Sequence, residues 1–273
     1  MAGALPPGSE LPSPTPRLLG RVEGSIGWLV FNNPERHNAL SRDMWEGIPP
    51  LLAALNDTGS VRVILLRGAG EEAFVSGADI SEFDAERATP EAVERYDAMV
   101  ERACAALAES PAPTLAMIRG HCLGGGLALA IACDLRLAAE DASFAIPAAR
   151  LGIGYRRPAV AALIALIGPA SAKEILFTAR RLDAREAYAM GLVNRVVPVG
   201  ELEAETRRTA KTIAGNAPLT IQAAKRAIAA LRSGDPQAVA EAESAIARCF
   251  DSADYAEGRR AFLEKRRPRF TGR

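Results

Sequence analysis

The sequence predicts an α/β fold with a largely parallel β-sheet, followed by a region built only of helices. Short β-prone segments alternate with segments of helical periodicity, which is typical of parallel sheets covered by helices. The β-prone segments are apolar on both faces, as expected of strands buried on both sides. From Glu201 onward the pattern is helical, with Pro218 and Pro236 separating Ala-rich stretches. We therefore expect an α/β core over residues 17–200 and a helical region over residues 201–273.

The amino-terminal segment, residues 1–16, is rich in Pro, Gly and Ser, and we predict that it is a disordered arm. It lacks a basic stretch followed by an apolar core, which argues against a secretory signal. The next segment, Leu18–Asn32, holds two β-prone runs on either side of Glu23-Gly24-Ser25 and predicts a β-hairpin.

A helix is predicted after Ser41, a good N-cap residue, because apolar residues recur at helical spacing as far as Leu55. Pro49 and Pro50 lie inside this helix and make it irregular. The later elements alternate between the two types: a buried strand at Val61–Gly68, a helix from about Pro90 to Ala108, a strand at Pro113–Gly120, a helix opening at Gly124 and a strand at Leu135–Glu140.

The chain carries 33 basic and 33 acidic residues, and 49% of its residues are hydrophobic. A balanced charge favours neither nucleic acid nor an anionic membrane, so we expect a globular protein with a small-molecule ligand. The longest apolar run, which begins at Pro158, is too short to span a bilayer. The four cysteines form no CxxC pair and there are only two histidines, so we expect no metal site and free thiols in a reducing cytoplasm.

Two glycine-containing turns, Phe74–Ile80 and Gly120–Ala130, each follow a predicted strand and lead toward a helix. Backbone N–H groups at a helix start lack intrahelical partners and favour negative charge. Two such turns side by side would present converging donors to an oxyanion, each worth roughly 3 kcal/mol in the transition state. The alternative is that the glycines only permit tight turns and close packing. Neither turn fits a dinucleotide or P-loop fingerprint, which argues against a nucleotide-phosphate cradle.

Five stretches resemble the motifs of the crotonase superfamily, the enoyl-CoA hydratase/isomerase family, and together they span nearly the whole chain beyond the amino-terminal arm. They are NNPERHNALS from Asn32, FVSGADISEF from Phe74, GHCLGGGLALAIACDLRLA from Gly120, AKEILFTARRLDAREAYAMGLVNRVVP from Ala172 and GRRAFLEKRRPRF from Gly258. The resemblance implies a spiral of ββα turns with a carboxy-terminal helical region that forms trimers, often paired into hexamers. It also implies an acyl-CoA thioester as substrate and no separate cofactor, because coenzyme A is part of the substrate.

The resemblance assigns roles to particular positions. The backbone N–H groups of Ala78 and Gly125 would form the oxyanion hole for the thioester carbonyl, in agreement with the glycine turns. The path of the CoA moiety would be lined by Arg36 and by the edge formed by Ala78, Asp79 and Ile80. Two residues of a neighbouring subunit would close over the adenosine end, or would serve only in packing and as solvated charge: Phe262 and Lys265.

The hydratases of this family use two glutamates for proton transfer, and the matching positions here are Ala128 and Ala148. A methyl group cannot transfer a proton, so the usual hydratase mechanism is not available at these positions. A third acidic position of the family is Arg156 in this chain. Three other carboxylates lie in or just after the first turn and could substitute as acids, or could be surface and capping groups: Asp79, Glu82 and Asp84.

Decarboxylation of a malonyl-type thioester needs an oxyanion hole but no base, because no proton is abstracted. Tyr155 could then orient the leaving carboxylate through one hydrogen bond, or could be a packed core tyrosine. The carboxy-terminal half is most similar to the methylmalonyl-CoA decarboxylases of the superfamily, although those have histidine where this chain has Ala78. We therefore expect a lyase that decarboxylates a methylmalonyl-CoA-like substrate. Two alternatives remain open: an enoyl-CoA hydratase or isomerase of fatty acid metabolism with an unusual acid such as Glu82, and a non-catalytic acyl-CoA-binding protein.

Overall fold

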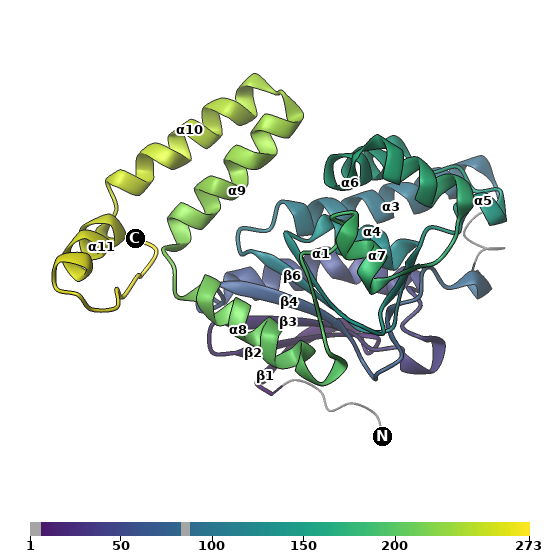
Figure 1. Ribbon diagram of the computed structural model, residues 1–273, viewed down its shortest axis with the longest axis horizontal. Helices are drawn as coiled ribbons and strands as arrows, with labels where there is room; N and C mark the ends of the chain where they lie inside the picture. Colours follow the sequence, from purple (N-terminus) through teal and green to yellow (C-terminus); the bar gives the residue numbers. More distant parts are fainter. Residues whose placement is uncertain (1–6, 83–87) are drawn as a thin grey trace.

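The computed structural model describes residues 7–82 and 88–273, which form an α/β core with a helical arm extending from it (Figure 1). The core is built on a seven-stranded sheet in the order β1-β2-β3-β4-β6-β8-β11. Neighbouring strands from β3 to β11 run parallel, whereas β1, β2 and β3 pair antiparallel. The strands are β1 (Ser9–Thr15), β2 (Leu18–Glu23), β3 (Ile26–Phe31), β4 (Val63–Gly68), β6 (Thr114–Ile118), β8 (Leu135–Ala139) and β11 (Arg195–Val197).

A smaller sheet, in the order β10-β9-β7-β5, packs beside the large one and carries the glycine turns. Three of its strands run parallel to one another, and only β10 is antiparallel to its neighbour. Its strands are β5 (Ala73–Val75), β7 (His121–Leu123), β9 (Ser143–Ala145) and β10 (Leu182–Asp183).

Both faces of the central strands of the large sheet are buried, as the apolar sequences predict. In β4, Ile64 and Leu66 belong to the main core, while Val63 and Leu65 belong to a second core on the opposite face. The main core lies under the helices α1 (Arg42–Asp57), α3 (Pro90–Ala108), α4 (Gly125–Ala132), α5 (Ala148–Leu151), α6 (Arg157–Thr178) and α7 (Ala184–Ala189). Short 3₁₀ turns occur at η1 (Pro34–Arg36), η2 (Ile80–Glu82) and η3 (Val199–Glu201).

The amino-terminal prediction is wrong over most of its length. Residues Ser9–Thr15 form β1, which pairs antiparallel with β2. The prolines of this segment are tolerated because β1 is an edge strand, where a missing N–H group faces away from the sheet. Residues 1–6 of the predicted arm lie outside the described residues.

The predicted boundary at residue 200 also differs from the structure. Helix α8 (Leu202–Ala214) packs on β3, β4, β6 and β8, and its Leu202 and Ala210 complete the second core. Helical periodicity alone could not reveal this, because a helix that covers a sheet and one that leaves it have the same period. The arm begins at α9 (Pro218–Ser233) and continues through α10 (Pro236–Phe250) and α11 (Ala253–Leu263), as Figure 1 shows in light green and yellow.

One described helix, α6, is long and apolar enough by length and composition to cross a membrane. Gly168 interrupts it with φ 74° and ψ 167°, and Pro169 follows directly. The interruption divides α6 into two shorter helices, and part of its surface packs on the main core.

Candidate active site

Three parallel strands of the small sheet, β5, β7 and β9, end at the same edge, and the residues singled out in the sequence follow these ends. The first turn follows β5, the second follows β7, and Pro147 and Ala148 follow β9. The carboxyl ends of parallel strands form the crevice where open α/β sheets bind ligands. The sheet topology therefore brings together three segments that are far apart in the sequence.

In the first turn, backbone pairing determines which way the Ala78 N–H group points. The Leu40 N–H donates to the Gly77 carbonyl at 2.8 Å, and the Asp79 N–H donates to the Leu40 carbonyl at 2.9 Å. Successive N–H groups of an extended chain point to opposite sides, so that of Ala78 points away from Leu40. Within the described chain this N–H group donates no hydrogen bond.

In the second turn, Gly124 takes a conformation with φ 50° and ψ −114°, and Gly125 begins α4. A Cβ on Gly124 would lie 3.8 Å from the Cα of Gly77, so the two turns are in direct contact. The Gly125 N–H group is at the helix start and, among the residues described, donates to no other group. The two predicted donors thus lie on adjacent turns with both N–H groups available to a ligand.

The Arg36 guanidinium extends along the first turn and is held there by Asp79. Its Nη1 donates to the two carboxylate oxygens of Asp79 at 3.0 and 2.8 Å and to the hydroxyl of Ser81 at 2.8 Å. Burial raises the pKa of Asp79, but hydrogen bonds from Ser81 and Arg36 outweigh it and hold this pKa below its usual value. Asp79 is therefore an ionised positioning group and a poor proton donor. The Ile80 backbone continues this edge into η2.

Ala128 and Ala148, which the resemblance predicts to occupy the positions of the hydratase glutamates, are both half-buried near the turns. Ala128 lies in the first turn of α4, and its N–H donates to the Gly124 carbonyl at 3.0 Å. Ala148 begins α5 directly after Pro147, whose Cδ would lie 3.9 Å from a Cβ on Gly124. Both residues therefore lie close to the second turn.

The carboxylates considered as substitutes are engaged elsewhere or not described. A Glu82 carboxylate oxygen accepts the backbone N–H of Arg42 at 2.9 Å, so this side chain caps the start of α1. Asp79 is bound to Arg36, as described above. Asp84 lies outside the described residues. The structure thus favours the capping role for Glu82.

Tyr155 lies between α5 and α6, half-buried against the main core. Burial, and to a smaller degree the nearby Cys104 thiol, raise the pKa of Tyr155 above its usual range. The hydroxyl therefore stays protonated at neutral pH. Its neighbour Arg156 is held by Asp97, with Nε 2.5 Å from the carboxylate oxygen.

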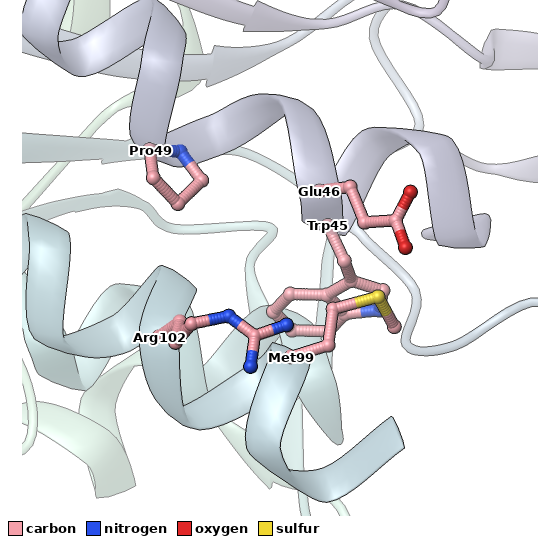
Figure 2. Close-up of a pocket in the computed structure, with 5 residues that line it drawn as sticks. All are labelled: Trp45, Glu46, Pro49, Met99 and Arg102. Atoms are coloured by element: carbon pink, nitrogen blue, oxygen red, sulfur yellow. The ribbon is translucent and has the colours of Figure 1, made fainter. Parts of the chain in front are cut away.

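A pocket of about 320 Å³, which sequence reasoning missed, lies between α1 and α3 and is lined by Trp45, Glu46, Pro49, Met99 and Arg102 (Figure 2). Trp45 stands between this pocket and the second turn, because a Cβ on Gly125 would lie 2.8 Å from its Cζ2 atom. In the sequence Trp45 appears only as one of several apolar residues at helical spacing. No local signal distinguishes a core tryptophan from one that walls a pocket.

Phe262 and Lys265 do not approach the turns of their own chain. Phe262 belongs to α11 and is 84% exposed, and Lys265 follows the helix with a left-handed φ of 53°. In Figure 1, α11 lies at the opposite end of the molecule from α5. A role for these two residues at the site therefore requires a second subunit and stays a prediction.

The sequence profile of a family described as enoyl-CoA hydratase/isomerase matches residues 21–273. The chain belongs to this family. A crotonyl-CoA hydratase of Syntrophomonas wolfei is 34% identical over 249 residues, which cover 91% of this chain and 95% of the relative. The structure of an enoyl-CoA hydratase/carnitine racemase from Magnetospirillum magneticum has 40% sequence identity and a TM-score of 0.91, covering 96% of this chain and 97% of that one. An enoyl-CoA hydratase structure from Bacillus anthracis has 34% identity and a TM-score of 0.88, covering 94% and 100%.

These comparisons confirm the predicted crotonase-type α/β fold and the family. The relatives named above are hydratases, so the closer resemblance to decarboxylases stays a prediction. Ala128 and Ala148, which the resemblance places at the glutamate positions of the hydratases, lie close to the two turns.

Proposed function

We propose that the protein binds an acyl-CoA thioester with its carbonyl oxygen between the N–H groups of Ala78 and Gly125, and that it stabilises an enolate there. The observation that carries this proposal is the contact of two turns whose N–H groups donate to no described residue. Such preorganised donors act on the charge that develops in the transition state. Arg36, held along the first turn by Asp79, would face the phosphates of the CoA moiety.

For the reaction, we propose decarboxylation of a malonyl-type thioester. The bond between the α-carbon and the carboxylate carbon breaks, and its electron pair passes into the thioester as an enolate while carbon dioxide leaves. A proton from solvent then adds to the α-carbon. No step needs a base, which is consistent with methyl groups at Ala128 and Ala148 and with the engagement of Asp79 and Glu82. The neutral Tyr155 hydroxyl would orient the departing carboxylate.

The second candidate is hydration or isomerisation of an enoyl-CoA, which the names of the relatives favour. Hydration requires an acid and a base near the thioester. The described carboxylates near the turns are engaged in the ion pair of Asp79 and the cap of Glu82. This candidate would therefore depend on a bound water or on a group that moves when the substrate binds.

The deciding experiment is incubation of the protein with methylmalonyl-CoA, malonyl-CoA and crotonyl-CoA, followed by mass spectrometry of the thioesters. We expect loss of carbon dioxide from a malonyl-type substrate and no gain of water by crotonyl-CoA. Hydration of crotonyl-CoA would overturn the decarboxylation proposal. Tight binding of all three without turnover would identify a non-catalytic acyl-CoA-binding protein.

Introducing carboxylates at positions 128 and 148 tests whether the alanines there are what prevents hydration. The double variant Ala128→Glu, Ala148→Glu places two carboxylates beside the oxyanion donors, and we expect it to gain crotonyl-CoA hydration that the parent protein lacks. The control is Ala149→Glu, an exposed neighbour on α5, which should gain nothing. Equal hydration by the parent and the double variant would show that the alanines do not limit this chemistry.

We further propose that the active form is a homo-oligomer, a trimer or a pair of trimers, in which Phe262 and Lys265 of one subunit cover the CoA end of the next. Exposed apolar residues on the arm support the proposal, because monomeric proteins rarely expose large apolar patches. The most exposed are Ile228, Leu231, Phe250, Phe262 and Leu263.

A further inference from the structure

A second cavity, of about 300 Å³, lies between the large sheet and the start of α8. It is located where the parallel strands β4 and β6 end, and its wall includes Gly200 of η3. Crevices at the carboxyl ends of parallel strands are preferred ligand sites, and a helix start favours anions. Of the two glycine turns only Phe74, which lies within β5, lines this cavity, and neither Ala78 nor Gly125 does, so it is distinct from the candidate oxyanion hole.

The Arg67 side chain lines the cavity, and its two terminal guanidinium nitrogens are not used in hydrogen bonds to described residues. Arg67 is only 9% exposed, and its Nε donates to the Gly68 carbonyl at 3.1 Å. Its Nη1 lies 3.6 Å from Glu203 Oε2, beyond hydrogen-bond distance. Within the described residues, neither terminal nitrogen makes a hydrogen bond. These donors line an open cavity, where a ligand or water can satisfy them.

Two other guanidiniums lie near this side chain, together with the Glu71 and Glu203 carboxylates that line the same cavity. Burial lowers the pKa of Arg67, Glu203 raises it, and the nearby guanidiniums of Arg207 and Arg119 lower it further. Arg119 also lines the cavity, and its contacts are long: 3.3 Å to Glu71 and 3.4 Å to Asp141. The Glu203 carboxylate is held more tightly by Arg207, at 2.8 Å, than by Arg67.

We propose that this cavity binds a small oxyanion, the phosphate or carboxylate group of a metabolite, between the guanidiniums of Arg67 and Arg119. The terminal nitrogens of Arg67 match the paired oxygens of such a group. On binding, Glu203 keeps its hydrogen bond to Arg207, and the exposed Glu71 carboxylate moves away from Arg119. Glu203 and Glu71 line the same cavity and oppose the ligand, so its affinity depends on both carboxylates.

The variant Glu203→Gln separates this proposal from a purely structural role for the cluster. Removal of one opposing charge should tighten binding of inorganic phosphate at least about threefold, measured by calorimetry at constant ionic strength. A structural ion pair would give no such gain. Glu201→Gln is the matched control, since Glu201 is exposed, lies two residues away and does not line the cavity.

Arg119→Gln should weaken phosphate binding at least about tenfold, because the ligand loses one of its two guanidinium partners. Arg185→Gln, at an exposed arginine of α7, is the control. Arg119 is partly exposed, so this variant should fold. Titration with acetate in parallel shows whether the site prefers a phosphate or a carboxylate group. Binding of either one supports the proposal.

Two results would overturn the proposal. One is that neither phosphate nor acetate binds the parent protein or Glu203→Gln. The other is phosphate binding that neither variant alters, which would locate the anion elsewhere, for example along Arg36. Both results leave the acyl-CoA proposal untouched, because the thioester experiments do not involve this cavity.

Discussion

At the scale of single residues, the candidate site depends on two positions, Gly124 and Gly125, that only a residue without a side chain can occupy. The φ 50° and ψ −114° of Gly124 are accessible to glycine alone among ordinary residues, and this conformation turns the chain into α4. Gly125 has no room for a methyl group, because Trp45 lies where its Cβ would be. The position of the second donor is therefore set jointly by backbone geometry and by the packing of one tryptophan.

Gly125→Ala should lower thioester turnover by about 10²–10³-fold, the loss typical of one oxyanion donor. The new Cβ would meet Trp45 Cζ2 at 2.8 Å, so the turn must shift and the N–H group moves with it. Turnover is measured on whichever thioester proves to be the substrate. The control is Gly258→Ala, where the nearest atom lies 3.6 Å from the new Cβ. Equal turnover by both variants would exclude Gly125 from the oxyanion hole.

Tyr155→Phe should reduce decarboxylation by at least about tenfold while leaving CoA affinity nearly unchanged, because one hydrogen bond to a charged group is lost. The raised pKa of Tyr155 adds a pH criterion. Its hydroxyl is neutral below the folded-state pKa, which lies above the usual value of about 10. Turnover by the parent protein should therefore show no tyrosine titration up to about pH 10. A decline in turnover that is centred near pH 9 in the parent protein and absent from the Tyr155→Phe variant would contradict the raised pKa of Tyr155.

At the scale of elements, the end of the chain is clamped onto α11 by two acidic residues of that helix. Asp254 accepts the N–H groups of Thr271 and Gly272 at 2.6 and 2.9 Å. Glu257 is bound by Arg266 at 2.6 and 3.0 Å and by Arg260 at 2.5 Å. These contacts position the segment that follows Phe262, which the oligomer proposal places over a neighbouring site.

Glu257→Gln should release this segment and increase amide hydrogen exchange over residues 266–273. Hydrogen bonds from Arg266, Arg260 and the Arg269 N–H hold the pKa of Glu257 well below its usual value. A depressed folded-state pKa stabilises the clamp above the unfolded-state pKa, about 4.3, and this stability is lost as pH falls. The difference between parent and variant should therefore be full at pH 7 and shrink below about pH 4. Glu264→Gln, which removes only an exposed pairing with Arg266, should change exchange much less.

At the scale of the whole molecule, the arm extends from a complete core and exposes apolar side chains. Lys225 of α9 is tied to Asp134 of the core at 2.8 Å, and Arg62 donates to the Phe270 carbonyl at 2.7 Å. These polar contacts anchor the base of the arm while leaving its apolar residues uncovered. An arm of this kind gains stability when it packs on another subunit.

Leu231→Asp should therefore shift the protein toward monomers in light scattering after size-exclusion chromatography, because Leu231 is 82% exposed on α9. If Phe262 and Lys265 of a neighbour cover the CoA end, the same variant should also weaken CoA binding. Thr212→Asp on α8, which is also exposed, is the control. An unchanged mass and affinity would show that the α9 surface is not an interface.

Local periodicity and motif identity were enough to predict the order of most elements and the family, and the resemblance predicts alanines at the positions of the hydratase carboxylates. The hairpin, α3, and the strands and helix around the second glycine turn all lie near their predicted ranges. The edge strand β1 was missed because its stability comes from pairing with β2, which its proline-rich sequence does not signal. The placement of α8 on the sheet was missed because helical periodicity does not identify the partner.

The surroundings of the candidate site depend on contacts between residues that are far apart in the sequence. Contact between Gly77 and Gly124 arises from the parallel pairing of β5 and β7, whose sequences lie almost fifty residues apart. The cap made by Glu82, the wall made by Trp45 and the position of the Arg67 guanidinium in its cavity likewise depend on long-range packing. The type of a residue determines which chemical group the chain can offer at that position. The neighbours that the fold supplies decide whether a carboxylate is free or engaged and whether a donor faces a ligand or the protein.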